Sequence, residues 1–147
     1  MSFDKYAQKG NLILEEIALQ LGMEGQRDIA FRVLRSVLHT LRDRLPVQES
    51  FHLLAQLPIA LKGIYVEGWK YQDKPNRKIQ DTASFIRSMI TDDYPAGHHD
   101  FASGKDAENA VRGVLTVLKH HITSGESSDI SKTLPPGIRS LWTSASA

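Results

Sequence analysis

Two stretches of this chain repeat one pattern: a long segment with one apolar face, a polar break, a short apolar segment and a Leu-Pro pair. Residues 30–65 align with residues 107–142 without a gap, at an offset of 77 positions. Both stretches must then take the same order of elements, and we interpret the pattern as an internal duplication. Nine positions are identical with the residue 77 places later: Ala30, Arg35, Val37, Leu38, Leu41, Glu49, Ser50, Leu57 and Pro58.

The long segment of each stretch is predicted to be a core helix. Its apolar residues recur every three or four positions, from Ala30 to Leu45 and again from Ala107 to Ile122, which is the spacing of a helix with one buried face. The second of these helices is expected to begin near Ser103, because Asp106 then lies in the first turn and suits the positive end of the helix dipole.

Each Leu-Pro pair is predicted to mark a kink between two short helices. Proline disfavours helical geometry in the residue before it and is well tolerated at the start of a new helix. Leu57-Pro58 and Leu134-Pro135 therefore serve as structural turns on this prediction.

The remaining segments complete an all-α fold. A helix over about residues 3–21, with Phe3 on its apolar face, precedes the first stretch and ends at Gly22. Residues 82–90 form its shorter counterpart, and the polar residues 67–79 form a connector. We predict a single compact helical domain over residues 1–142 with two pseudo-repeated halves, about 1–66 and 80–142, and a flexible C-terminal tail over 143–147. Each half consists of a preceding helix, a long helix and two short helices joined at the Leu-Pro kink.

Three segments together resemble a known family: "VLHTLRDRL", "LLAQLPIALKGIYVEGW" and "AVRGVLTVLKHHITSGESSDISKTLPPGIRSLW". In order and spacing they are similar to the prokaryotic domain-of-unknown-function 2267 family, over roughly residues 3–142. The resemblance implies a small all-helical protein with no established activity and no assigned catalytic residues. The basic, aromatic connector and the adjacent histidine pairs depart from that pattern.

Composition excludes several classes of protein. Hydrophobic residues make up 41% and charged residues 24%, which is ordinary for a globular domain, and a net charge of +1 gives no overall attraction for polyanions. The chain has no cysteine, which excludes disulfides and sulfur-based metal sites. The sequence shows no export signal and no long apolar run, so we expect a soluble cytoplasmic protein with no membrane partner.

Catalytic motifs are absent, and we predict a non-enzymatic protein without a cofactor. The sequence has no phosphate-binding Gly-rich loop, no nucleophile elbow and no zinc-protease motif. Glu15-Glu16 and Asp92-Asp93 are adjacent pairs, and neighbouring residues on a helix point in directions about 100° apart.

Two histidine pairs are candidate metal ligands. His98-His99 lies in a predicted loop and His120-His121 in the last turn of a predicted helix, where the imidazoles are expected to cap that helix. Adjacent residues bind a single ion poorly, so we predict no metal site. A metal-dependent enzyme that brings the two pairs together is the minor hypothesis.

The leading hypothesis is a protein-interaction or regulatory module, which binds a partner or itself through grooves between the two halves. Its anchors are the aromatic residues Tyr65, Trp69 and Trp142, which are expected to be exposed. The alternative is binding of an anionic ligand or single-stranded nucleic acid through the connector. That binding would use Trp69, Tyr71, Lys74, Arg77 and Lys78.

Two observations oppose the alternative. Glu67, Asp73 and Asp81 dilute the positive charge, and no nucleic-acid-binding motif is present, so nucleic acid is not the expected partner. A purely structural role would explain the same residues, with Trp69 packed against the helical core and the charged residues in a solvated loop above it.

Overall fold

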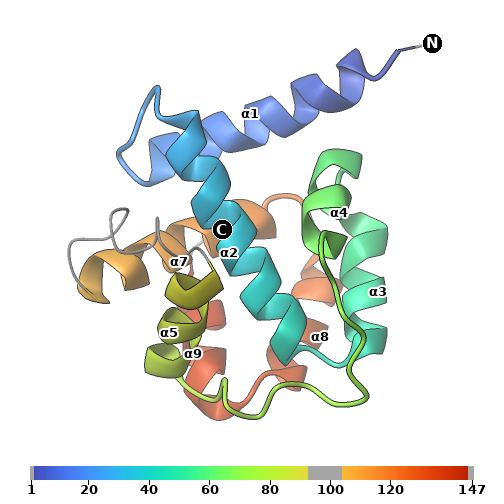
Figure 1. The fold of residues 1–147 in the computed structure, drawn as a ribbon, viewed down its shortest axis with the longest axis vertical. Coiled ribbons are helices and arrows are strands. Elements are labelled where there is room, and N and C mark those ends of the chain that lie inside the picture. The colour runs from blue at the N-terminus through green and yellow to red at the C-terminus, as the bar shows by residue number, and fades with distance from the viewer. Residues whose placement is uncertain (1, 93–103, 146–147) are drawn as a thin grey trace.

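The structure, a computed structural model, describes residues 2–92 and 104–145, which form eight α-helices and no β-strand (Figure 1). The predicted all-α fold is confirmed. The helices are α1 (Asp4–Gln20), α2 (Arg27–Arg44), α3 (Val47–Gln56), α4 (Ile59–Val66), α5 (Thr82–Asp92), α7 (Gly104–Lys119), α8 (Ser124–Thr133) and α9 (Pro136–Ser144).

Three pairs of helices begin at the same offset of 77 residues: α2 with α7, α3 with α8, and α4 with α9. Between the two short helices of each half, Leu57 and Leu134 adopt extended backbone geometry, with ψ of 145° and 144°. The following proline then precedes the first residue of the next helix, as expected from the steric clash that proline imposes on its predecessor. An origin by duplication remains our interpretation of the sequence.

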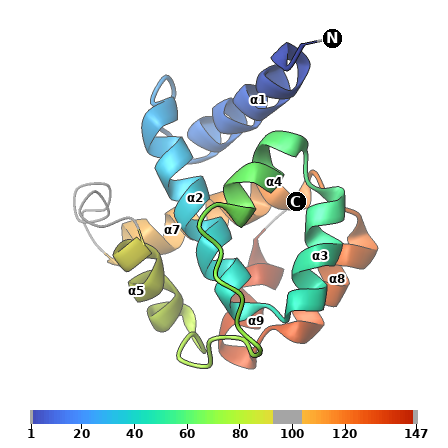
Figure 2. The same cartoon turned by 45° about the vertical axis from the view of Figure 1, so that its right-hand side comes forward.

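The long helices α2 and α7 contact each other at the centre of the core (Figure 1). Helix α1 packs on α2, α4 and α7, while α5 packs on α7, α9 and α2. Each contact of α1 thus has a counterpart, at the offset of 77, among the contacts of α5. Helices α3 and α8 lie side by side (Figure 2), so this pair brings corresponding positions of the two halves together.

Small residues allow other segments to cross the second short helix closely. A Cβ added to Gly10 of α1 would lie 2.8 Å from the Cβ of Ala60 in α4. The position 77 residues after Ala60 is Gly137 in α9, where an added Cβ would clash with the backbone oxygen of Gln80. These contacts hold α1 against α4 and the start of α5 against α9.

Two details of the sequence prediction are wrong. Helix α9 continues to Ser144 and Ala145 is only 4% exposed, so no tail begins at residue 143. Phe3 was expected on the buried face of the first helix, but it precedes α1 and is 84% exposed. The first turns of α1 project from the body of the molecule (Figure 1), and burial begins at Gly10.

The connector runs from the end of α4 to the start of α5 and is anchored near the end of α2. The Asn76 N–H donates to the backbone oxygen of Asp43 at 2.8 Å, and Ile79 is 1% exposed.

None of the described helices combines the length and the apolar character needed to span a bilayer.

Candidate functional site

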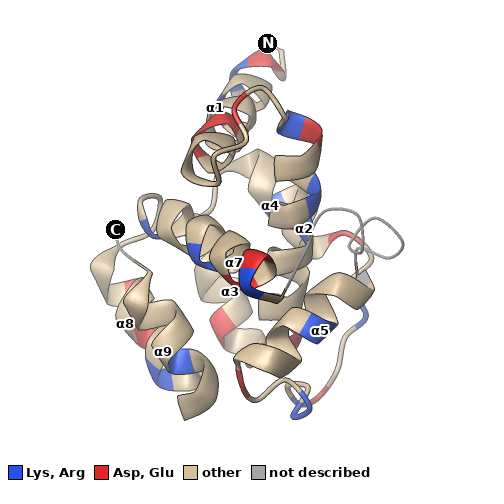
Figure 3. Cartoon of the chain, turned by 90° about the vertical axis from the view of Figure 1, so that its left-hand side faces the viewer, with Lys and Arg blue, Asp and Glu red and all other residues tan. Residues whose placement is uncertain are grey.

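A cavity of about 630 Å³ lies between the C-terminal end of α2 and the connector. Its lining includes five cationic side chains and one carboxylate, together with the ring of Trp69. Figure 3 shows Lys and Arg residues on several helices, and further ones on the loop that precedes α5. We call this space the connector cavity, and its charged residues are Arg42, Asp43, Lys70, Lys74, Arg77 and Lys78.

Trp69 reaches the connector cavity because the chain turns sharply after α4. Gly68 takes a φ of +65°, which is favourable only for glycine, and the Trp69 N–H donates to the backbone oxygen of Val66 at 3.0 Å. The indole ring packs edge-on against Tyr65, with centroids 5.9 Å apart, and tilted against Phe51 at 6.3 Å. Trp69 is therefore held in one position and is only partly buried.

Arg42 connects the cavity to the core. Its side chain is 8% exposed, and its guanidinium donates to the backbone oxygens of Tyr65 at 2.9 Å and Glu67 at 3.0 Å, which lie at the C-terminal end of α4. It also lies 5.8 Å from the centre of the Trp69 ring. The cation thus satisfies carbonyl groups that the end of a helix leaves without intrahelical partners.

The other cations of the connector cavity are exposed lysine and arginine side chains. Arg44 lies near this cluster, and burial together with the charge of Arg77 lowers its pKa. Like charges concentrated in this way repel each other, and a bound anion would relieve the repulsion.

The structure brings together most of the residues predicted for the anion-binding connector. Trp69, Lys74, Arg77 and Lys78 all line the cavity. Tyr71 is not part of the lining and is 68% exposed, and its hydrogen bond to Asp73 raises the pKa of the phenol.

Two of the three expected interaction anchors are core residues. Tyr65 is 0% exposed and Trp142 is 1% exposed, so the expectation that both are exposed is wrong. The Tyr65 hydroxyl hydrogen-bonds Ser50 at 2.7 Å, and the Trp142 indole N–H donates to the backbone oxygen of Ser127 at 3.0 Å. Each polar tip has a partner, which makes complete burial of the ring favourable.

His120 and His121 do not form the capping arrangement predicted for them from the sequence. His120 and His121 follow the last residue of α7 and both bind the carboxylate of Glu16 in α1, with N–O distances of 2.7 and 3.2 Å. Burial of Glu16 raises its pKa, but the hydrogen bonds and charges of the two histidines outweigh burial and lower it. His98 and His99 lie outside the described residues.

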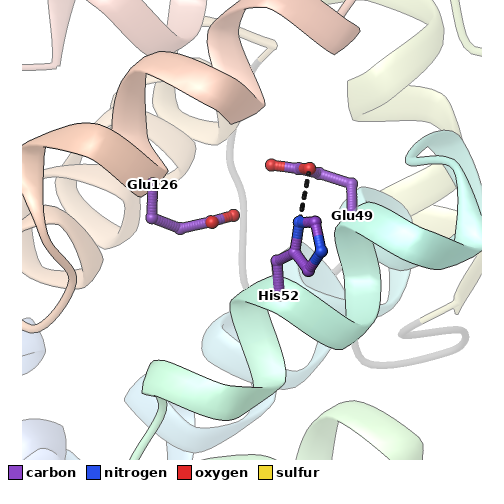
Figure 4. A group of neighbouring side chains, drawn as sticks. All are labelled: Glu49, His52 and Glu126. Atoms are coloured by element: carbon purple, nitrogen blue, oxygen red, sulfur yellow. Dashed lines mark ion pairs between the residues drawn. The ribbon is translucent and has the colours of Figure 1, made fainter.

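A second cluster was missed by the sequence prediction, and it lies where α3 meets α8. The carboxylates of Glu49 and Glu126 point toward each other from these helices, and the ring of His52 lies beside them (Figure 4). One ligand atom from each of the three residues falls within 4.8 Å of the others. We call Glu49 and Glu126 the carboxylate pair.

The carboxylate pair is buried in an unfavourable electrostatic environment. Glu49 is 7% exposed and Glu126 is 5% exposed, and the Oε1 atom of each has no hydrogen-bond partner among the described residues. Burial, followed by the neighbouring Glu49 and then the charge of Asp129, raises the pKa of Glu126 to about 7. The sequence signal for this pair was the Glu-Ser dipeptide, which recurs at the offset of 77. Residues at equivalent positions of two helices can face each other when those helices pack together, as α3 and α8 do.

These features define a small all-α domain with one basic cavity and one buried carboxylate pair among its described residues. Residues 10–141 match the family described as an uncharacterized conserved protein, DUF2267, and the chain belongs to that family. The resemblance inferred from the sequence is confirmed. A comparison with curated proteins finds no match.

Proposed function

We propose that the protein is a non-enzymatic cytoplasmic binding module whose ligand is a small phosphate-bearing anion held in the connector cavity. The observation that carries this proposal is the lining of that cavity, where five cations face a single carboxylate. A volume of about 630 Å³ lies within the range typical of small-molecule sites. The lack of cysteine fits a reducing cytoplasm.

The buried aromatic residues favour this proposal over the protein-interaction hypothesis in its original form. An interaction anchor must reach the partner, and Tyr65 and Trp142 are enclosed by the core. Trp69 remains partly accessible in the connector cavity, where a planar ligand group can pack beside it.

The proposal is tested with inorganic pyrophosphate as the probe and tryptophan fluorescence as the readout. The chain has two tryptophans and Trp142 is buried, so a change caused by the ligand is expected to come from Trp69. The triple variant K74E/R77E/K78E should lose binding. The matched control R87E/K105E/K132E changes three exposed cations outside the cavity lining by the same charge and should retain it.

An oligo(dT) titration separates a small anion from single-stranded nucleic acid. Nucleic-acid binding would appear at about micromolar concentrations and weaken steeply with added salt, because counterions are released from the strand. Tight oligo(dT) binding with no response to pyrophosphate would contradict the proposed ligand class, and equal binding by both triple variants would contradict the proposed site.

Self-association through α1 is a second candidate, supported by an apolar groove of about 510 Å³ between α1 and the turn at Pro58. Leu12 is 61% exposed and Ile59 is 52% exposed, and both line the groove. The proposed occupant is α1 of a second copy in antiparallel orientation. With Leu12 at the centre, that arrangement places Lys9 of one copy opposite Glu15 of the other, so the charges are complementary.

Light scattering across a concentration series tests self-association. The wild-type protein should be dimeric and L12E monomeric, since a carboxylate at the centre of the contact is buried twice by the twofold symmetry. Val66 in α4 is exposed and lies outside both the groove and α1, so V66E serves as the control and should remain dimeric. A monomeric wild-type protein at all concentrations would remove this candidate.

A further inference from the structure

We propose that Glu49, His52 and Glu126 form a binding site for one divalent transition-metal ion between α3 and α8. The three side chains converge from two helices (Figure 4), and their ligand atoms lie within 4.8 Å of one another. The Nδ1 atom of His52 is already 3.3 Å from Oε2 of Glu49. Two ligand atoms of a tetrahedral zinc ion are about 3.4 Å apart, given zinc–ligand distances near 2.1 Å.

The carboxylate pair lacks the partners that buried carboxylates normally have. More than nine tenths of each glutamate is buried, and each has an Oε1 atom without a hydrogen-bond partner among the described residues. The ion pairs of the described residues give neither carboxylate a lysine or arginine partner, and the one cation-forming neighbour is His52. Two buried carboxylates at this separation repel each other unless a cation or a proton lies between them.

Helix capping does not explain why these glutamates are there. Each is the third residue of its helix, where a glutamate side chain commonly returns to the backbone N–H of the N-cap residue. The N-cap residue of α3 is Pro46, which has no N–H. The N-cap residue of α8 is Thr123, and its N–H already donates to Oε1 of Gln56 at 2.7 Å. Both carboxylates are therefore directed away from the caps and toward each other.

The type of ligand selects the class of ion. His52 lies one turn after Glu49 and its side chain is 63% exposed, so it stands at the solvent edge of the buried pair and leaves a route for entry. An imidazole with two carboxylates suits zinc or manganese, with water at the remaining positions. Calcium prefers six to eight oxygen ligands, which this cluster does not provide.

Isothermal titration calorimetry with zinc chloride tests the proposal on the untagged, metal-stripped full chain at about pH 7.5, where metal ligands are largely deprotonated. We expect one zinc ion per chain and an increase in Tm on binding. Because even residues that only support a ligand contribute about tenfold or more to metal affinity, E126Q and H52A should each weaken binding at least tenfold. H52A changes an exposed side chain and tests the site without disturbing the core.

The cluster of Glu16, His120 and His121 supplies matched controls, because it also combines a carboxylate with imidazoles. E16Q and H120A/H121A should bind zinc as tightly as the wild-type protein. Zinc binding that survives in E126Q and H52A, or that is lost in E16Q, would overturn the proposal. So would the absence of any zinc binding, which would mean that the carboxylate pair is held together by a shared proton alone.

Discussion

The two halves of the molecule each place a cation beside an aromatic ring at equivalent positions, but the surroundings of the two pairs differ. In the first half Arg42 binds the carbonyl oxygens of Tyr65 and Glu67, and in the second half Lys119 binds those of Trp142 and Ala145. Lys119 corresponds to Arg42 at the offset of 77, and Trp142 corresponds to Tyr65. Both cations cover the C-terminal end of the last short helix.

The difference between the halves arises in the chain segment after that helix. After α4 the chain continues into the connector, and Trp69 supplies an additional ring that lies partly open beside the cavity. In the second half Trp142 itself is the ring next to the cation, 5.2 Å from Nζ of Lys119, and it is buried. Among the described residues, the same contact therefore lies beside a cavity in the first half and around a buried tryptophan in the second.

The largest effect is expected for the buried tryptophan. Trp142→Ala should lower the free energy of unfolding by about 3–5 kcal/mol, because it leaves a large cavity and removes the hydrogen bond to Ser127. Trp69→Ala should lower it by only about 1 kcal/mol, since that ring is partly exposed. Urea denaturation measures both values. Equal losses would contradict the contrast between a structural and an accessible ring.

The next largest effect is expected at the carboxylate pair, where α3 packs on α8. It should appear as a dependence of the free energy of unfolding on pH. The pKa of Glu126 is raised from 4.5 to about 7 in the folded protein. The protonated form is thus favoured by folding, so the associated stability is present below pH 4.5 and is lost as the pH rises through about 7.

Glu126→Gln stays neutral throughout this range. In the presence of EDTA it should match the wild-type protein near pH 4.5 and exceed it by up to about 3 kcal/mol above pH 7. Urea denaturation across a pH series measures the difference. A constant difference at all pH values would show that Glu126 does not titrate as inferred.

The two equivalent cations are expected to differ by a smaller amount. Arg42→Met leaves the carbonyl oxygens of Tyr65 and Glu67 without this donor in a largely buried place and should cost about 2–3 kcal/mol. Lys119→Met should cost about 1 kcal/mol, because Lys119 is more accessible to water, which can replace it. Thermal unfolding of the two variants provides the comparison, and the reverse order would contradict it.

The smallest effect is expected at Glu16, where α1 meets the end of α7. Its folded pKa is lowered by His120 and His121 against the effect of burial, so its contribution is present above the unfolded value of 4.5 and is lost as the pH falls through the folded value. Since the side chain is 36% exposed, Glu16→Gln should cost less than about 1 kcal/mol near pH 6. The difference should vanish at low pH in the same denaturation experiment.

Individual residues show which structural features could be predicted from the sequence and which could not. The long and short helices and the Leu-Pro turns follow from apolar spacing and from the geometry that proline imposes locally. The exposure of Tyr65 and Trp142 was misjudged because hydrogen bonds to Ser50 and Ser127, 15 residues away, allow their polar tips to be buried. The contacts of His120 and His121 with Glu16 join residues 104 and 105 positions apart, which no local pattern encodes.

The sequence by itself determined the class of fold, the family, the order of the helices and the residues that build the connector. These depend on short-range preferences, in which each residue is read with neighbours a few positions away. The tertiary structure decided which aromatic rings are accessible, that the connector cations share a cavity with Trp69, and that Glu49 faces Glu126. Those outcomes depend on how helices far apart in the chain pack together, because burial and electrostatic interaction are set by distance in space.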